Sequence, residues 1–182
     1  MTVAQDNWVF LGSNTSLSGE TGIRVPRDIG APPRSPSLPY YDLLMVRWHI
    51  KIISSDTLYF FHNLNFLGSS WNTRIWRYAP GSVTPAETNS TSAGFMRLTQ
   101  TATTDALMGV MFINNIPRPS TGERGVEASV VSVNNGGQTP TVQIASGSTI
   151  YATPMTVLAI NTVGAAALSV GSTMSVFGCN IQ

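Results

Sequence analysis

The sequence contains few charged side chains. Only 10% of its 182 residues are Asp, Glu, Lys or Arg, whereas soluble domains carry about 25%. Charge keeps monomers soluble and discourages their strands from pairing with neighbouring molecules. The composition therefore favours a β-rich protein whose surface is largely covered by other subunits, rather than an enzyme.

Cysteine, lysine and long apolar runs are also scarce. The single cysteine, Cys179, excludes an internal disulfide and a cysteine-based zinc site, and its apolar surroundings favour a buried thiol. A net charge of +1 with one lysine, Lys51, offers no basic surface for nucleic acid. No segment reaches the roughly 20 apolar residues that span a bilayer, and the first residues lack the features of a signal peptide. We expect cytoplasmic synthesis and neither a nucleic-acid nor a membrane partner.

Residues 1–41 differ in composition from the rest of the chain. Their prolines are concentrated between Pro26 and Pro39, where they favour an extended, polyproline-like path. The segment is either a disordered linker or an extended arm that lies across a neighbouring subunit. Disordered tails rarely carry apolar clusters, so we favour the arm. Its candidate anchors on a partner are Trp8, Phe10, Leu11, Ile23 and Val25.

Residues 42–182 carry the pattern of an all-β domain. Leu44, Val46, Trp48 and Ile50 alternate with more polar residues, which is the period of two typical of a strand. Similar short runs follow, separated by Gly, Pro, Asn and Ser turns, at residues 58–61, 73–78, 94–98, 107–113, 126–133, 141–145, 155–160 and 173–177. About eight strands at this spacing predict a jelly-roll-like β-sandwich. The polar stretch 78–93 is expected to be an exposed loop, and the only candidate helical turn lies near residues 164–168.

The segment from Trp71 to Tyr78 combines aromatic rings with polar and cationic side chains. Rings beside Asn and Arg can stack on sugars and bind hydroxyl groups. The same residue types are enriched in subunit interfaces. Two interpretations therefore stand for Trp71, Arg74, Trp76 and Arg77: an interface, which we favour, or a glycan-binding site.

Side chains suited to catalysis are few and scattered. The two histidines, His49 and His62, lie on different predicted elements, and no carboxylate near His62 in the sequence is placed to orient it. The carboxylates form no metal-ligand pattern, and no nucleophile elbow, phosphate loop or zinc-protease motif is present. A glycosidase pair such as Asp56 and Asp105 is the weakest hypothesis. We therefore predict no catalytic residue, no metal and no cofactor.

Three segments in order resemble a family of small jelly-roll virion proteins of tailed bacteriophages. They are Leu44–Lys51, Leu58–Asn63 and Trp71–Tyr78, and the chain closes with Gly171–Gly178. In that family a strand of the type LxVxxxI leads to LxFNxD and NYxxRY, and the last strand ends GSxFxVFG. The resemblance covers residues 42–182. The chain departs from it at Phe61-His62-Asn63-Leu64, where the family often has Phe-Asn-Gly-Asp.

The resemblance implies a virion component, since such proteins are usually trimeric and act as capsid decoration (cement) proteins, head spikes or tail-associated fibres. The leading expectation is a non-enzymatic decoration protein that forms a homotrimer and binds the major capsid protein or other virion proteins. The alternative is a tail or fibre protein that binds host surface glycan.

Overall fold

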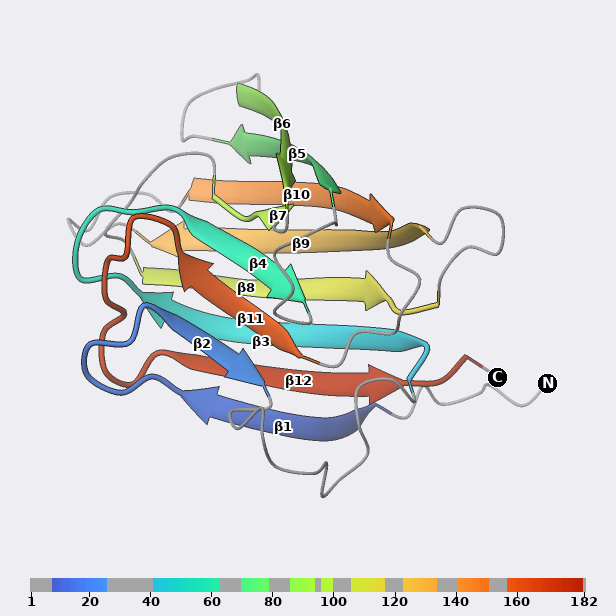
Figure 1. Cartoon of the computed structure of the whole chain (residues 1–182), viewed down its shortest axis with the longest axis horizontal. Coiled ribbons are helices and arrows are strands. Elements are labelled where there is room, and N and C mark those ends of the chain that lie inside the picture. Colours follow the sequence, from blue (N-terminus) through green and yellow to red (C-terminus); the bar gives the residue numbers. More distant parts are fainter. Residues whose placement is uncertain are drawn as a thin grey trace.

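In a computed structural model the chain is all-β (Figure 1). The structure describes residues 8–25, 41–62, 70–78, 86–93, 96–99, 106–116, 123–133, 141–150 and 157–181. These residues form twelve strands and no helix, and every strand pairing is antiparallel. The predicted fold class is confirmed at this level, although the strands outnumber the eight or so expected.

The strands form two sheets that pack face to face. The large sheet contains, in spatial order, β1 (Val9–Thr15), β12 (Thr173–Cys179), β3 (Leu43–Lys51), β8 (Ala106–Asn114), β9 (Glu123–Val133), β10 (Thr141–Ile150), β5 (Ser70–Tyr78) and β6 (Ala86–Ala93). The small sheet contains β2 (Gly22–Val25), β11 (Leu158–Thr162), β4 (Leu58–His62) and β7 (Met96–Arg97). In Figure 1 the strands β2, β11 and β4 cross in front of the large sheet diagonally, and β5 and β6 lie at the top, at the end of the large sheet that these three strands do not cross.

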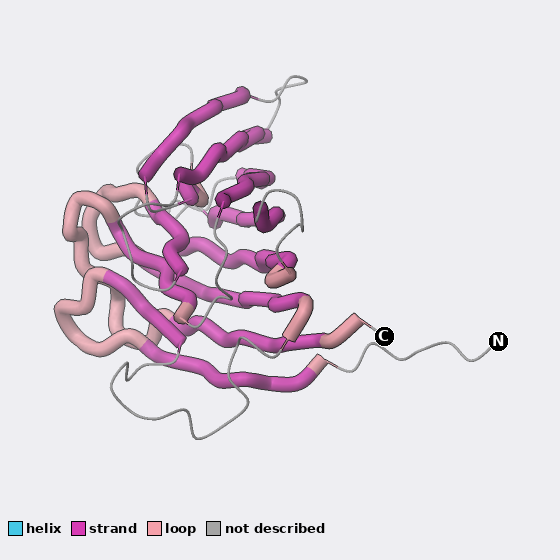
Figure 2. Tube along the Cα trace, turned by 45° about the vertical axis from the view of Figure 1, so that its right-hand side comes forward, coloured by secondary structure: helices cyan, strands magenta, loops and turns pink. Residues whose placement is uncertain are grey.

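Eight of these strands are paired in a nested order. β1 pairs with β12, β2 with β11, β3 with β8 and β4 with β7. The other four strands form two hairpins, β5–β6 and β9–β10, inserted between β4 and β7 and between β8 and β11. The hairpins join each other through β10 and β5 and extend the large sheet past β8. Figure 2 shows that the strands of this extension are rotated strongly relative to those at the other end, as expected from the twist of a wide sheet.

Strand β3 shows how the sequence pattern produces the core. Leu44, Val46, Trp48 and Ile50 are buried, whereas Arg47, His49 and Lys51 are exposed. Side chains alternate between the two faces of a strand, so one face of β3 packs on the small sheet and the other faces outward. The buried positions of the small sheet, including Phe60 and Ile160, complete the same core.

The predicted division into an arm (1–41) and a body (42–182) is wrong for the described part of the arm. β1 and β2 come from that segment and are hydrogen-bonded into the two sheets. Ile23 and Val25 are buried in this chain's own core, and Leu11 packs against it. These three residues are therefore not available as anchors on a partner, because their apolar side chains are used within the fold. The proline-rich residues 26–40 lie outside the described part of the chain.

Two further predictions are wrong. Residues 86–93, expected in a loop, form β6, an edge strand with the polar sequence AETNSTSA. Strand formation here follows from pairing with β5 rather than from an apolar pattern. Residues 164–168, expected as a helical turn, form an irregular loop in which Ala165 has a φ of 64°.

Candidate interaction surface

The outward positions of the large sheet form a single continuous face, which we call the outer face. Residues paired directly across antiparallel strands share a face, so the register defines its rows. One row comprises Thr15, Thr173, His49, Met108, Val142 and Tyr78. The next comprises Ser13, Ser175, Arg47, Val110, Ile144, Trp76 and Glu87. A third comprises Phe10, Phe177, Met45, Phe112, Glu127, Ser146 and Arg74.

The third row carries an aromatic cluster at the end of the face formed by β1, β12, β3 and β8. The rings of Phe10 and Phe177 meet edge to face with their centroids 5.5 Å apart. Trp8 packs on Phe112 at 6.2 Å. Even so, Phe10 is 57% exposed and Phe112 is 48% exposed. The cluster is ordered by its own ring contacts and still presents a large apolar area to solvent.

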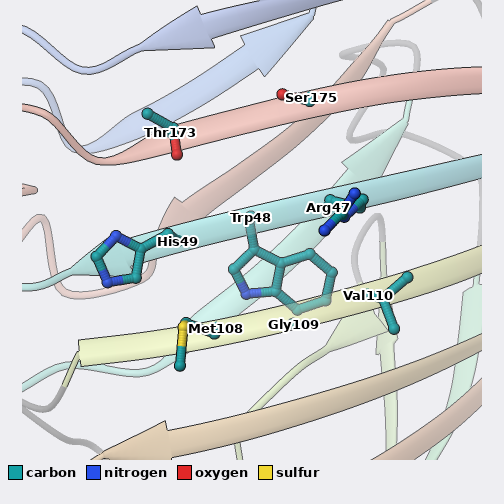
Figure 3. A pocket seen from close by; sticks show the side chains of 8 residues that line it. All are labelled: Arg47, Trp48, His49, Met108, Gly109, Val110, Thr173 and Ser175. Carbon is teal, nitrogen blue, oxygen red and sulfur yellow. The ribbon is translucent and has the colours of Figure 1, made fainter. Parts of the chain in front are cut away.

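Beside this cluster the outer face is hollowed into a groove of about 520 Å³ (Figure 3). Its lining comes from three adjacent strands, as Arg47, Trp48 and His49 of β3, Met108, Gly109 and Val110 of β8, and Thr173 and Ser175 of β12. The groove therefore combines two cationic or basic side chains, two hydroxyl groups and an apolar wall. Met108 is 46% exposed within it. Such a surface suits a partner that offers both apolar and polar groups.

The structure divides the aromatic and arginine residues predicted as one site. Arg74 and Trp76 lie on the outer face, where the Arg74 guanidinium lies 5.6 Å from the centroid of the Trp76 ring. Arg77 occupies a position that alternates with them and shares the face of buried Ile75. Trp71 has the same parity as Arg77, and its side chain lies outside the described part of the structure. Arg77 is therefore separated from Arg74 and Trp76, because its position along β5 places it on the opposite face.

Arg74 also pairs with Glu87 across β5 and β6, with Nε 3.1 Å from the carboxylate oxygen. Both side chains are well exposed, so their charges are screened by solvent. We expect Arg74→Ala to lower the free energy of unfolding by only about 0.5–1 kcal/mol. Urea denaturation of Arg74→Ala, Glu87→Gln and the double variant would measure the coupling. A coupling above about 1.5 kcal/mol would contradict this view of the pair as a surface feature.

The residues considered for catalysis are separated in the described parts of the molecule. Asp56 is 7% exposed, and its carboxylate is occupied by backbone N–H groups, with Thr57 N at 2.7 Å and Ala166 N at 3.2 Å. His49 lies on the outer face of β3, and none of the positions paired in register with it across the described strands is a carboxylate. Asp105 and the His62 side chain lie outside the described residues. These contacts give Asp56 a structural role in anchoring the loop that contains Ala166.

Other potential sites are absent from the described residues. They contain no group of three or more His, Cys, Asp and Glu side chains that could hold a metal ion. Cys179 is buried, and its thiol contacts the Asn180 carbonyl at 3.6 Å. No helix in the part of the chain that the structure describes is long and apolar enough to cross a membrane.

The outward side of the small sheet differs from the outer face. Phe61 and Ala159 are paired in register and alternate with core residues, yet they are 7% and 2% exposed. The small sheet is therefore buried on both sides at this position, whereas the large sheet is buried on one side only. Of the two sheets, the large one presents the open apolar surface.

Comparison with known proteins adds no relative. No protein-family model matches the chain, and no curated protein matches it. The resemblance to phage virion proteins remains a hypothesis, and function has to be argued from the surface itself.

Proposed function

We propose that this chain is a structural virion subunit, a capsid decoration protein of a tailed bacteriophage that works as a homotrimer and has no enzymatic activity. The observation that carries the proposal is the open apolar outer face of the large sheet, in a chain with only 10% charged residues. Contiguous apolar surface of this kind marks interaction sites in soluble proteins. In our proposal the surface is covered by other subunits after assembly.

The strand order supports a jelly roll as the underlying fold. A jelly roll contains eight strands in two packed sheets. Without the two inserted hairpins, this chain has four strands in each sheet. The first of these eight strands pairs with the last, the second with the second-last, and so on to the two in the middle of the sequence. The β5–β6 and β9–β10 hairpins are then additions that widen one sheet. This strand order supports the jelly-roll fold that the family resemblance implies, but two of its eight strands, β1 and β2, come from before residue 42, and fold alone does not determine function.

Assembly on a capsid would use the apolar contacts of many copies. Burial of apolar surface contributes about 25 cal/mol per Å², and symmetry lets many weak contacts act together. Trp8 and Phe10 remain candidate contacts with capsid or neighbouring subunits, because both lie on the outer face. The proline-rich residues 26–40 remain a candidate arm over those neighbours.

Host-glycan binding is the alternative, and one observation weighs against it. The Trp76 ring, which would stack on a sugar, already has the Arg74 guanidinium over it. A site of this kind would require Arg74 to move away from the ring before binding. We therefore rank glycan binding second.

A side-chain-resolution cryo-EM map of the intact particle tests the proposal. We expect trimers of this chain on the outside of the capsid shell, in contact with the major capsid protein. Density only at the tail would overturn the decoration role and support the glycan-binding alternative, which a glycan array would then test. Absence of the chain from purified particles would exclude a virion role altogether.

A further inference from the structure

We propose that the outer face over β1, β12, β3, β8, β9 and β10 is the surface through which this chain binds a second copy of itself, with the groove between Arg47 and Met108 near its centre. The inference rests on the proposed function, which includes a homotrimer, and it names the surface through which the copies associate. Four observations support this assignment.

The first observation is the kind of side chain that is exposed. Phe10, Met108 and Phe112 are each about half exposed on one face, beside the partly buried Met45 and Phe177. Aromatic residues, Met and Arg are the types enriched in the cores of protein interfaces. Monomers rarely leave a contiguous apolar patch larger than a few hundred Å² in water.

The second observation is charge. Arg47 and Lys51 are exposed on β3, and Glu127 is exposed on β9 beside Phe112. The same face therefore carries both signs, so two copies can oppose basic and acidic positions. With a net charge of +1 per chain, identical copies repel one another only weakly. These features favour a second copy over a strongly charged partner.

The third observation is area. The face is six strands wide, at about 4.8 Å per strand, and about nine residues long, as in β3, at about 3.4 Å per residue. These dimensions give an area of roughly 900 Å². Each partner in a standard interface contributes about 800 Å². The face is therefore large enough for a specific and stable contact between subunits.

The fourth observation is the contrast between the sheets. The outward residues Phe61 and Ala159 of the small sheet are already buried within one chain, so they leave no comparable apolar surface there. The outer face of the large sheet is the place where burial remains incomplete in the isolated chain.

The test compares the self-association of the full-length protein with that of three variants. Met108→Arg and Phe112→Arg each place a charge in the apolar part of the face. Val170→Arg is the matched control, because Val170 is 70% exposed in the loop between β11 and β12 and is not part of the strands that form the face. Sedimentation equilibrium would give the mass and the dissociation constant, and circular dichroism would verify that each variant is folded.

We expect wild type and Val170→Arg to form the same oligomer. Met108→Arg and Phe112→Arg should dissociate at least about 100-fold more easily, the effect of losing central interface contacts. Arg47→Glu, an exposed strand position that leaves the core intact, should also weaken association and serves if an apolar variant fails to fold.

Unchanged association in Met108→Arg, Phe112→Arg and Arg47→Glu would overturn the assignment of this face as the self-association surface. That result would not contradict the proposed decoration role. A wild-type protein that stays monomeric at all concentrations would overturn both this interface and the homotrimer. The decoration role would then depend on the cryo-EM map alone, so the two failures are distinguishable.

Discussion

Gly109→Ala is expected to lower the free energy of unfolding by about 3 kcal/mol, at the upper end of the range for an overpacked core. Gly109 on β8 is paired in register with Trp48 on β3. A methyl group built on Gly109 would lie 2.0 Å from Cζ2 of the Trp48 ring and 2.4 Å from Cε2. Real contacts of this type are about 3.5–4.0 Å, so the ring would have to move. Trp48 is only 4% exposed and is surrounded by core residues, which leaves it little space.

The same substitution should affect the outer face. Trp48 and Gly109 both line the groove, so displacement of the indole alters the surface that we assign to self-association. Guanidinium denaturation followed by tryptophan fluorescence would measure the loss of stability, and the native emission spectrum should change as the indole environment changes. The matched control is Gly125→Ala on β9, where an added methyl group meets nothing within 4 Å. Equal stability of the two variants would show that the Trp48 ring does not restrict position 109.

Asp56→Ala is expected to lower the free energy of unfolding by roughly 3 kcal/mol at pH 7, because several backbone N–H groups, including the buried one of Ala166, lose a charged acceptor. The carboxylate accepts hydrogen bonds from the backbone of Thr57 and of the loop 163–166. It holds that loop next to the Thr162 hydroxyl group, which donates to the Ala166 carbonyl at 2.7 Å. Ala165, with its positive φ, lies between Gly164 and Ala166, whose backbone N–H groups both bond the Asp56 carboxylate, so the contacts hold a strained residue in the loop.

The contribution of Asp56 should depend on pH. Burial alone would raise the pKa of this carboxyl, but backbone hydrogen bonds from Gly164, Thr57, Ala166 and Val163 outweigh burial and lower it below its ordinary value of 3.8. A lowered pKa in the folded state means that the unfolded chain binds the proton more readily. The stabilisation is therefore fully present above about pH 4 and is lost as the pH falls through the folded-state pKa.

Denaturation of wild type and Asp56→Asn between pH 7 and pH 2 would test this direction. Asn keeps the size and one acceptor oxygen but carries no charge, so the difference in stability from wild type should be largest near neutral pH and should shrink in acid. Asp42→Asn is the control, because Asp42 is a half-buried carboxylate that accepts one surface hydrogen bond, from Ile181 N at 3.0 Å. A constant difference across the pH range would contradict a charged role for Asp56.

Sequence patterns predicted where individual strands lie more reliably than which other strands they pair with. The alternation in Leu44–Ile50 correctly indicated which β3 side chains are buried together. β6 was missed because its residues are polar throughout, and an edge strand can form through backbone pairing with little apolar burial. The predicted arm failed for the related reason that short apolar runs such as Gly22–Val25 do not specify whether they pack on their own chain or on another.

The interface or glycan site predicted on residues 71–78 also shows that neighbours in sequence need not be neighbours in space. Trp76 and Arg77 are adjacent in sequence, but successive positions along a strand lie on opposite faces. Conversely, Trp8 and Phe112 meet in space although more than a hundred positions separate them, and no local signal in the sequence connects them. The aromatic cluster and the groove beside it could be found only after the register of β1, β12, β3 and β8 was known.

The low charge, the all-β class and the residues of each strand that share a face could be predicted before the fold was known, because these properties follow from composition and from the period of two. Which of the two faces is covered could not be predicted in this way. That outcome depends on the nested pairing of distant strands, which places the small sheet over one side of β12, β3 and β8. The opposite side exposes Phe10, Met108 and Phe112 to solvent, because none of the described strands packs over it.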